Sequence, residues 1–439
     1  MIADLSHLRR ISTVRSDKNI KFLTPAVYSG GWCPMRLACN IAENTPGLSY
    51  LMVCMPECAT HSRGFNSLPE GPDGEKRWLY VLDANEVIFG CHNGVCDALR
   101  QMADEGTRAV MMIATCVTDL IGEDFESIIE EMQPTMDMKL TYVTLGQFKN
   151  FGTPIGTSKV GEALVALMDK PAEIDKKTVN VLNISGWQAK GSRVKLPLIV
   201  DALRKRGIRV RELTSEIPLT EYEQAPTAAL NLVLSPNMLA MAERMKKKFG
   251  TPYVALDDAF RVEDIDACYA EIERILDISL GNEFAAWKAK AIELEAQAKA
   301  ELGGLRYVML TEVNMPVQLA NYLADFGMEP LLMHVADMLP DDLVHAKKLK
   351  EKGFDPPICR IMNQDHDVEV IRDTLQPDLA MGYVNWPVPG MPCCEEMTSD
   401  FGGITGYERT VGILRRIFAV KNTGKMEQGG FDIYGSVPV

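Results

Sequence analysis

The feature that most constrains the fold is a series of short apolar runs, each followed by a segment with the 3.6-residue spacing of an amphipathic helix. Runs such as YLMVC, AVMMIA and YVML are apolar at every position. Strands of this kind are buried on both faces, which is typical of a parallel sheet covered by helices. The chain is therefore predicted to be an α/β protein.

The strand and helix pattern restarts twice along the chain. The first restart follows a charged segment at residues 169–178, and the second follows a long helical stretch at residues 264–302. A single hydrophobic core stops growing at about 250–300 residues, whereas this chain has 439. We predict three consecutive Rossmann-like domains with parallel sheets flanked by helices. The expected parts are a leader at 1–20, domain I at 21–174, domain II at 175–280, a bridging helix at 281–303, and domain III at 304–439 with a C-terminal helix.

Charge and hydropathy exclude several classes of partner. The formal net charge is −14, and no basic stripe offsets it, so we expect no nucleic acid partner. No apolar run reaches the roughly 18–20 residues that span a bilayer, and the N-terminus lacks the apolar core of a signal peptide, so we expect a cytoplasmic protein with no membrane partner. The chain has no G-x-x-x-x-G-K-[ST] and no G-x-G-x-x-G after a strand. If ATP is used, another protein binds it.

Three of the eleven cysteines stand at positions suited to binding a ligand. Cys116 follows a strand and opens a helix, and Cys58 follows another strand, so both are expected at the edge of a sheet where ligands bind. Cys33 lies in the loop SGGWCP. Iron–sulfur ligation requires thiolates at such loop-rich sites. Three cysteines are one too few for a four-cysteine cluster, which predicts a fourth ligand or a partner subunit.

Other roles for the cysteines remain open at this point. Free cysteine is often a small buried hydrophobe, and this is the interpretation favoured for Cys39, Cys54, Cys96 and Cys268. Zinc sites commonly use C-x₂₋₄-C pairs, which Cys54-x₃-Cys58 and Cys91-x₄-Cys96 resemble. A nucleophilic pair at positions 91 and 92 lacks a third group, and no catalytic residue is predicted.

The cysteine spacing resembles that of the nitrogenase component 1 superfamily, which includes the molybdenum–iron protein and protochlorophyllide reductase. The intervals of 25 and 58 residues between Cys33, Cys58 and Cys116 are similar to those of the cluster cysteines of the nitrogenase β subunit. The segments EVIFGCHNGVCDAL, ATCVTDLIGEDFESI and ALNLVLSPNMLAMAERMKKKFGTPYVAL resemble family motifs in the same order, as do QPDLAMGY and GYERTVGILRRI.

The resemblance implies an iron–sulfur cluster, either [4Fe-4S] or a larger P-cluster-like group, shared at a subunit interface. Cys33, Cys58 and Cys116 would be this chain's ligands. The second subunit would be a paralogous component 1 subunit or a second copy of this chain. A separate ATP-hydrolysing iron protein would deliver the electrons, so ATP would not be bound here.

The sequence departs from the cofactor-bearing α subunit at two positions. Leu234-Ser235-Pro236 stands where that subunit has a cysteine, and Thr405 stands where it has a histidine. Ser and Thr are poor substitutes for thiolate and imidazole ligands, so we expect no iron–molybdenum-type cofactor held in the usual way. Cys393 and Cys394 are expected in a loop, either as core residues or lining a substrate pocket. Near Gln147 the chain lacks the serine with which the β subunit binds its oxidised cluster.

Two functions are consistent with these residues. The leading hypothesis is an oxidoreductase: the iron–sulfur subunit of a nitrogenase-like, ATP-dependent reductase that relays electrons through the cluster to an undefined substrate. The alternative is a scaffold subunit for metallocofactor assembly. Both predict the cluster, and they differ in turnover, because a scaffold transfers metal to an acceptor whereas a reductase consumes electrons and ATP.

Overall fold

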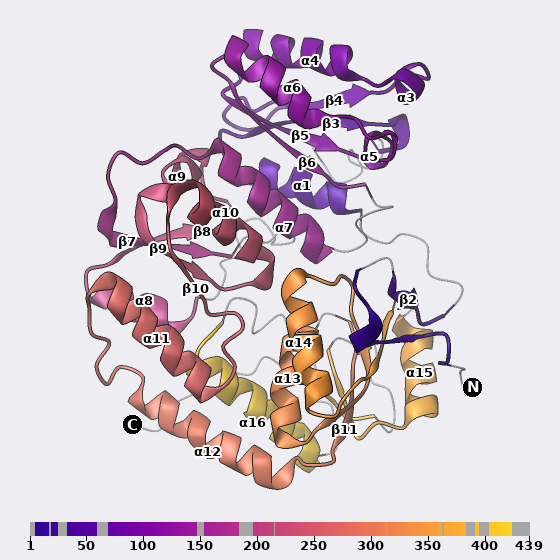
Figure 1. Cartoon of the computed structure of the whole chain (residues 1–439), viewed down its shortest axis with the longest axis vertical. Helices are drawn as coiled ribbons and strands as arrows, with labels where there is room; N and C mark the ends of the chain where they lie inside the picture. Colours follow the sequence, from indigo (N-terminus) through magenta and orange to yellow (C-terminus); the bar gives the residue numbers. More distant parts are fainter. Residues whose placement is uncertain are drawn as a thin grey trace. The chain divides into compact units, whose positions relative to one another are not determined.

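The chain contains three separate sheets (Figure 1). By internal packing it divides into two compact units. Unit 1 comprises Met1–Gly31, Val194–Gly207 and Ala255–Val439, and unit 2 comprises Trp32–Arg193 and Ile208–Val254. The computed structural model describes residues 5–16, 19–24, 33–58, 69–146, 153–183, 196–214, 216–311, 313, 315–361, 364–382, 391–394 and 404–423.

The first sheet of unit 2 has four parallel strands in the order β4-β3-β5-β6. Its strands are β3 Ser49–Cys54, β4 Arg77–Val81, β5 Ala109–Ala114 and β6 Lys139–Thr144. Its helices are α1 Pro34–Glu43, α3 Glu86–Phe89, α4 His92–Asp104, α5 Cys116–Ile121, α6 Phe125–Met132 and α7 Thr153–Leu164. Helices α1 and α7 cover one face, and α4 and α6 cover the other.

Alternate residues of the central strands explain why both faces are covered. Tyr50 and Met52 of β3 point into the core formed with α1 and α7. Their neighbours Leu51 and Val53 point into the core formed with α4 and α6. All four side chains are at most 1% exposed, as the uninterrupted apolar run predicts.

The second sheet of unit 2 has the order β10-β9-β7-β8, and β7 pairs in parallel with both β8 and β9. Its elements are β7 Asp175–Leu182, β8 Arg209–Leu213, α9 Leu219–Glu223, β9 Ala228–Val233, α10 Leu239–Phe249 and β10 Tyr253–Ala255. Helix α10 also packs against α7. Buried Asn180 and Asn231 hydrogen-bond each other between β7 and β9 (2.7 Å), which satisfies two polar groups inside this sheet.

The sheet of unit 1 has seven strands, with the path β1-β13-β12-β11-β14-β15 and β2 also on β13. Strand β1 is antiparallel to β13, whereas the other pairs are parallel. The strands are β1 Arg9–Arg10, β2 Lys21–Phe22, β11 Arg306–Met309, β12 Glu329–His334, β13 Pro357–Arg360, β14 Leu379–Met381 and β15 Cys393–Cys394. The helices of unit 1 are α8 Leu198–Lys205, α11 Val262–Leu276, α12 Ala285–Glu301, α13 Pro316–Leu323, α14 Pro340–Glu351, α15 Gln364–Leu375 and α16 Tyr407–Thr423.

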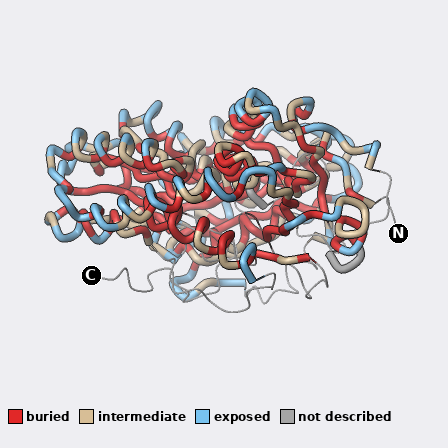
Figure 2. The backbone as a smooth tube through the Cα atoms, turned by 90° about the horizontal axis from the view of Figure 1, so that it is seen from below, coloured by how far each residue is buried: buried red, intermediate tan, exposed pale blue. Residues whose placement is uncertain are grey.

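The α/β class with parallel sheets flanked by helices is confirmed. Figure 2 shows buried segments inside the chain and exposed segments on outward helix turns and in loops. The expected long helix over residues 264–302 is instead two helices, α11 and α12. The break begins at Asp277, which has a left-handed backbone (φ 51°) and ends α11. The Glu273 side chain then accepts the N–H of Leu280 (2.5 Å), which stabilises the turn between the helices.

Candidate metal centre

Cys58 and Cys116 lie beyond the ends of two neighbouring strands. Val53 of β3 is opposite Ala114 of β5, so both strands end at the same edge of the sheet. The Thr115 N–H continues this pairing by donating to the Val53 carbonyl (3.3 Å). Cys116 is the first residue of α5, and Cys58 ends a single helical turn at residues 56–58. Both thiols are thus at the carboxyl edge of the sheet, where parallel folds place their ligand sites.

Cys33 is the residue that precedes α1, and its extended backbone (φ −78°, ψ 125°) makes it the N-cap. Pro34 occupies the first helical position, where a missing N–H costs nothing. The backbone N–H groups of Met35 and Arg36 face the Cys33 sulfur closely enough to lower the pKa of its thiol, although burial has the larger, opposite effect. A helix N-terminus favours negative charge, so these N–H groups offset part of the cost of ionising the buried thiol.

The three thiols interact electrostatically with one another. Burial raises the pKa of Cys33, and negative charge on Cys116 and Cys58 raises it further, while the two helix N–H groups partly oppose the rise. Burial likewise raises the pKa of Cys58, and negative charge on Cys116 raises it further, while the Met55 backbone partly opposes the rise. Three half-buried sulfur atoms that repel one another as anions would be stabilised together by a cationic metal group.

The three thiols are also of the ligand type that an iron–sulfur cluster uses. Zinc–sulfur bonds are about 2.3 Å long, so sulfur ligands of one zinc ion lie roughly 4 Å apart. Cys33, Cys58 and Cys116 interact as charged groups across the space between α1, α5 and the turn at residues 56–58. Cluster ligands bind different iron atoms and lie further apart, and thiolates are the ligands that iron–sulfur clusters use, so the donor type is compatible with such a cluster.

Cys39 and Cys54 are core residues, as predicted. Both are 0% exposed and belong to the apolar core between the first sheet and α1. Cys393 and Cys394 differ from the expectation of a loop, because they form strand β15 beside β14. Both are at most 1% exposed, which makes them part of the core of unit 1.

The positions that depart from the α subunit offer no metal ligand. Leu234 is buried, and Ser235 precedes a short 3-10 helix. Thr405 is fully buried, and its hydroxyl has no hydrogen-bond partner within the described part of the chain. Gln147 lies outside the described residues.

Sequence reasoning missed two groups of potential metal ligands and one groove. The groups are His92 with Cys96 and Glu131 in unit 2, and Asp258 with Asp341 and His345 in unit 1. Each includes an i,i+4 pair on one helix, which is visible in sequence, but the third member is remote. The groove has a volume of about 270 Å³. It lies beside α11, α12 and α16, and its aromatic lining comes from Tyr269, Phe284 and Tyr407.

The comparisons with known proteins agree with one another. The sequence model of the family described as nitrogenase component 1 type oxidoreductase matches residues 33–421. The nitrogenase iron-molybdenum cofactor biosynthesis protein NifE of Nostoc sp. is 27% identical over 75% of this chain and 69% of its own length. The protein of the same name from Clostridium pasteurianum is 28% identical over 50% of this chain and 47% of its own length.

A solved structure supports the fold independently of close sequence similarity. The structure titled nitrogenase Cp1 at pH 6.5 superposes with a TM-score of 0.63 and covers 92% of this chain and 94% of its own. The identity is 12%, so the likeness concerns the fold alone. None of the described helices is both long and apolar enough to cross a membrane.

Proposed function

Because the chain belongs to the nitrogenase component 1 type oxidoreductase family, we propose that it is an iron–sulfur subunit of a nitrogenase-like system that acts as a scaffold in metallocofactor assembly. The names of its relatives are the observation that carries this proposal, since they are cofactor biosynthesis proteins. These names favour the scaffold over the reductase, which was the leading hypothesis from sequence.

Cys33, Cys58 and Cys116 are proposed as the cluster ligands of this chain. Two observations support the assignment: Cys58 and Cys116 follow strands that end at one edge of the first sheet, and the three thiols interact electrostatically with one another. A bound cluster would supply electron storage, while the chain's own residues hold the thiolates. The N–H groups at the start of α1 stabilise the anionic form of Cys33.

The partner subunit is proposed to bind beside Cys116. Helix α5 carries this cysteine at its start and an exposed Leu120 (57%) near its end. Helix α3, which contacts α5, presents Ile88 (72%) and Phe89 (83%). Apolar side chains gathered in this way indicate a protein interface. A paralogous subunit, or a second copy, covering α3 and α5 would stand where a fourth cluster ligand is needed.

A scaffold must release what it holds, and the two departures from the α subunit agree with this requirement. Leu234 and Thr405 cannot bind a soft iron site as thiolate or imidazole does. A cofactor precursor would therefore be held without the permanent ligands of an α subunit.

The test is anaerobic purification of the chain with its partner, followed by iron and sulfide quantification and EPR. Cys58→Ala is expected to lose the cluster signal, whereas Cys268→Ala, which removes a half-buried cysteine of unit 1, is expected to keep it. A wild-type protein without iron would overturn the cluster assignment. Transfer of metal to an acceptor protein supports the scaffold, whereas electron and ATP consumption with an iron protein and a substrate would support the reductase instead.

A further inference from the structure

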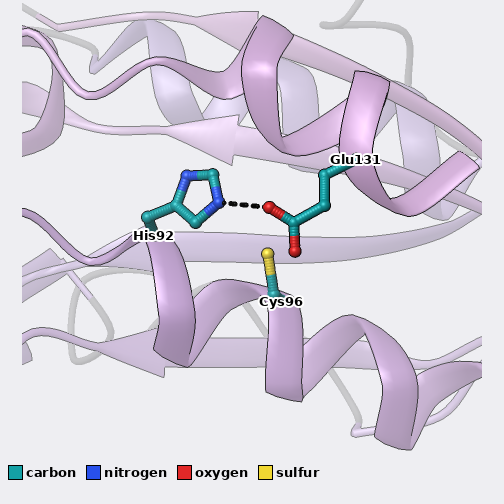
Figure 3. A group of neighbouring side chains, drawn as sticks. All are labelled: His92, Cys96 and Glu131. Carbon is teal, nitrogen blue, oxygen red and sulfur yellow. Dashed lines mark hydrogen bonds and ion pairs between the residues drawn. The ribbon is translucent and has the colours of Figure 1, made fainter.

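A second group of metal-binding side chains lies on the other face of the first sheet, between α4 and α6 (Figure 3). His92 and Cys96 are one helical turn apart on α4, so they project from the same side of this helix. Glu131 projects toward them from α6. The three ligand atoms all lie within 4.8 Å of one another.

The group reaches from the apolar core to the surface. The Cys96 residue is 2% exposed and belongs to the apolar core beneath the helices. The side chains of His92 and Glu131 are 33% and 52% exposed, so these two ligands lie at the surface. An ion entering from water would meet the exposed imidazole and carboxylate first and the buried thiol last. The surroundings of the sulfur are apolar, so a thiolate there would be costly without a bound cation.

His92 and Glu131 already contact each other without a metal ion. His92 Nε2 lies 2.8 Å from Glu131 Oε2, which aims the imidazole nitrogen at the carboxylate (Figure 3). An ion placed among the three groups would replace this hydrogen bond with two metal–ligand bonds. The Nε2 proton would move to Nδ1 through solvent or be released if Nδ1 already carries one, and the proton of the Cys96 thiol would pass to solvent.

One cation already competes for the carboxylate. Arg100 Nη2 lies 3.8 Å from Glu131 Oε1, while its Nη1 lies 2.6 Å from Asp97 Oδ1. The guanidinium can therefore keep its closer partner, Asp97, when Glu131 turns to a metal. A surface ion pair at 3.8 Å contributes little stability, so its loss is a small cost.

We propose that His92, Cys96 and Glu131 bind one divalent transition-metal ion of the zinc class. A thiolate, an imidazole and a carboxylate together favour zinc, cobalt or nickel over magnesium and calcium, which prefer oxygen ligands alone. Three protein ligands leave a fourth tetrahedral position for water or a second molecule. The site is separate from the cluster cysteines and does not depend on the proposed function.

Two of these ligands, His92 and Cys96, were considered in the sequence analysis, but each was paired with Cys91. Cys91 and His92 are adjacent, and Cys91 and Cys96 have zinc-like spacing. The group consists of His92, Cys96 and Glu131, without Cys91, which is 1% exposed and donates its backbone N–H to Glu123 (2.6 Å). Glu131 supplies the third ligand from a different helix.

The test is titration of the full chain with cobalt(II) alone under anaerobic conditions, following the sulfur-to-cobalt charge-transfer absorption. Cobalt bound by other cysteines is common to all variants, so only differences between them are used. The wild type is expected to bind one more cobalt ion, with more charge-transfer absorption, than Cys96→Ser. His92→Gln and Glu131→Gln are expected to weaken binding of that ion at least about tenfold.

Glu130→Gln is the matched control, because it removes the same charge from an exposed neighbouring position of α6 and is expected to bind like the wild type. Equal cobalt stoichiometry and absorption in the wild type and Cys96→Ser would overturn the proposal. So would equal weakening by Glu130→Gln and Glu131→Gln, since that outcome means a general charge effect. His92→Gln keeps the test valid if Cys96→Ser fails to fold.

Discussion

Glu408→Gln tests whether a buried carboxyl group in unit 1 makes stability depend on pH. Glu408 is 0% exposed, and its Oε1 accepts the N–H of Leu198 at the start of α8 (2.8 Å). Its Oε2 has no hydrogen-bond partner among the described residues. Burial raises the pKa of this carboxyl group to about 7. Glutamine keeps an oxygen for Leu198 but cannot ionise.

The expected size follows from linkage. An unfolded glutamate has a pKa of about 4.3, so a folded value of about 7 corresponds to roughly 4 kcal/mol at about 1.4 kcal/mol per unit. The folded pKa is the higher one, so this stability is present below pH 4.3 and is lost as pH rises through 7. About 3 kcal/mol of the loss falls between pH 5 and pH 8. The Glu408→Gln variant is expected to lack this pH-dependent loss of stability, because glutamine does not ionise.

Urea unfolding followed by circular dichroism at pH 5, 6, 7 and 8 measures this difference. The free energy of unfolding of Glu408→Gln minus that of the wild type should be about 3 kcal/mol larger at pH 8 than at pH 5. Glu293→Gln, at an exposed position of α12, is the control and should differ from the wild type by less than about 0.5 kcal/mol throughout. Parallel pH profiles for Glu408→Gln and the wild type would refute the assignment of a raised pKa.

Three further results are expected. Glu223→Gln should lower the free energy of unfolding by about 2–3 kcal/mol in urea, because this buried carboxylate accepts hydrogen bonds from Lys139 Nζ (2.8 Å) and the Arg108 guanidinium; an unchanged midpoint would mean that neither bond contributes. Phe89→Asp should change the free energy of unfolding by less than about 0.5 kcal/mol relative to the wild type. The same variant should associate more weakly with the partner subunit in ultracentrifugation, and undiminished association would place the interface elsewhere. In the cluster-free protein, iodoacetamide should modify half-buried Cys33 well before the fully buried Cys39, as read by peptide mass spectrometry; the reverse order would contradict their burial.

Apolar runs allowed most strands to be predicted, because a strand buried on both faces needs hydrophobic residues throughout. Strands β3 and β5 are of this kind. Strands β1 and β2 were missed, since two residues such as Arg9–Arg10 carry no periodicity. Strand β15 was missed because two cysteines beside prolines resemble a loop. The break after α11 depends on a left-handed Asp277, which its residue type does not require.

The sites differ in how much the sequence indicates. Cys58 and Cys116 were assigned to a sheet edge because each follows a recognisable strand, and the structure places them there. The convergence of Cys33 on them could be expected from family resemblance alone, since its loop has no periodic signal. Glu131 could not be joined to His92 by sequence, because the pairing depends on how α4 and α6 pack.

The pairing of β1 with β13 affects how the chain folds while it is being made. Arg10 lies opposite Pro357, so the N-terminal strand is synthesised roughly 350 residues before its partner. At a translation rate of about 5–20 residues per second, roughly 20–70 s pass between the synthesis of β1 and that of β13, during which β1 lacks this partner. Its two arginines, Arg9 and Arg10, keep that waiting edge charged, which disfavours pairing with another nascent chain.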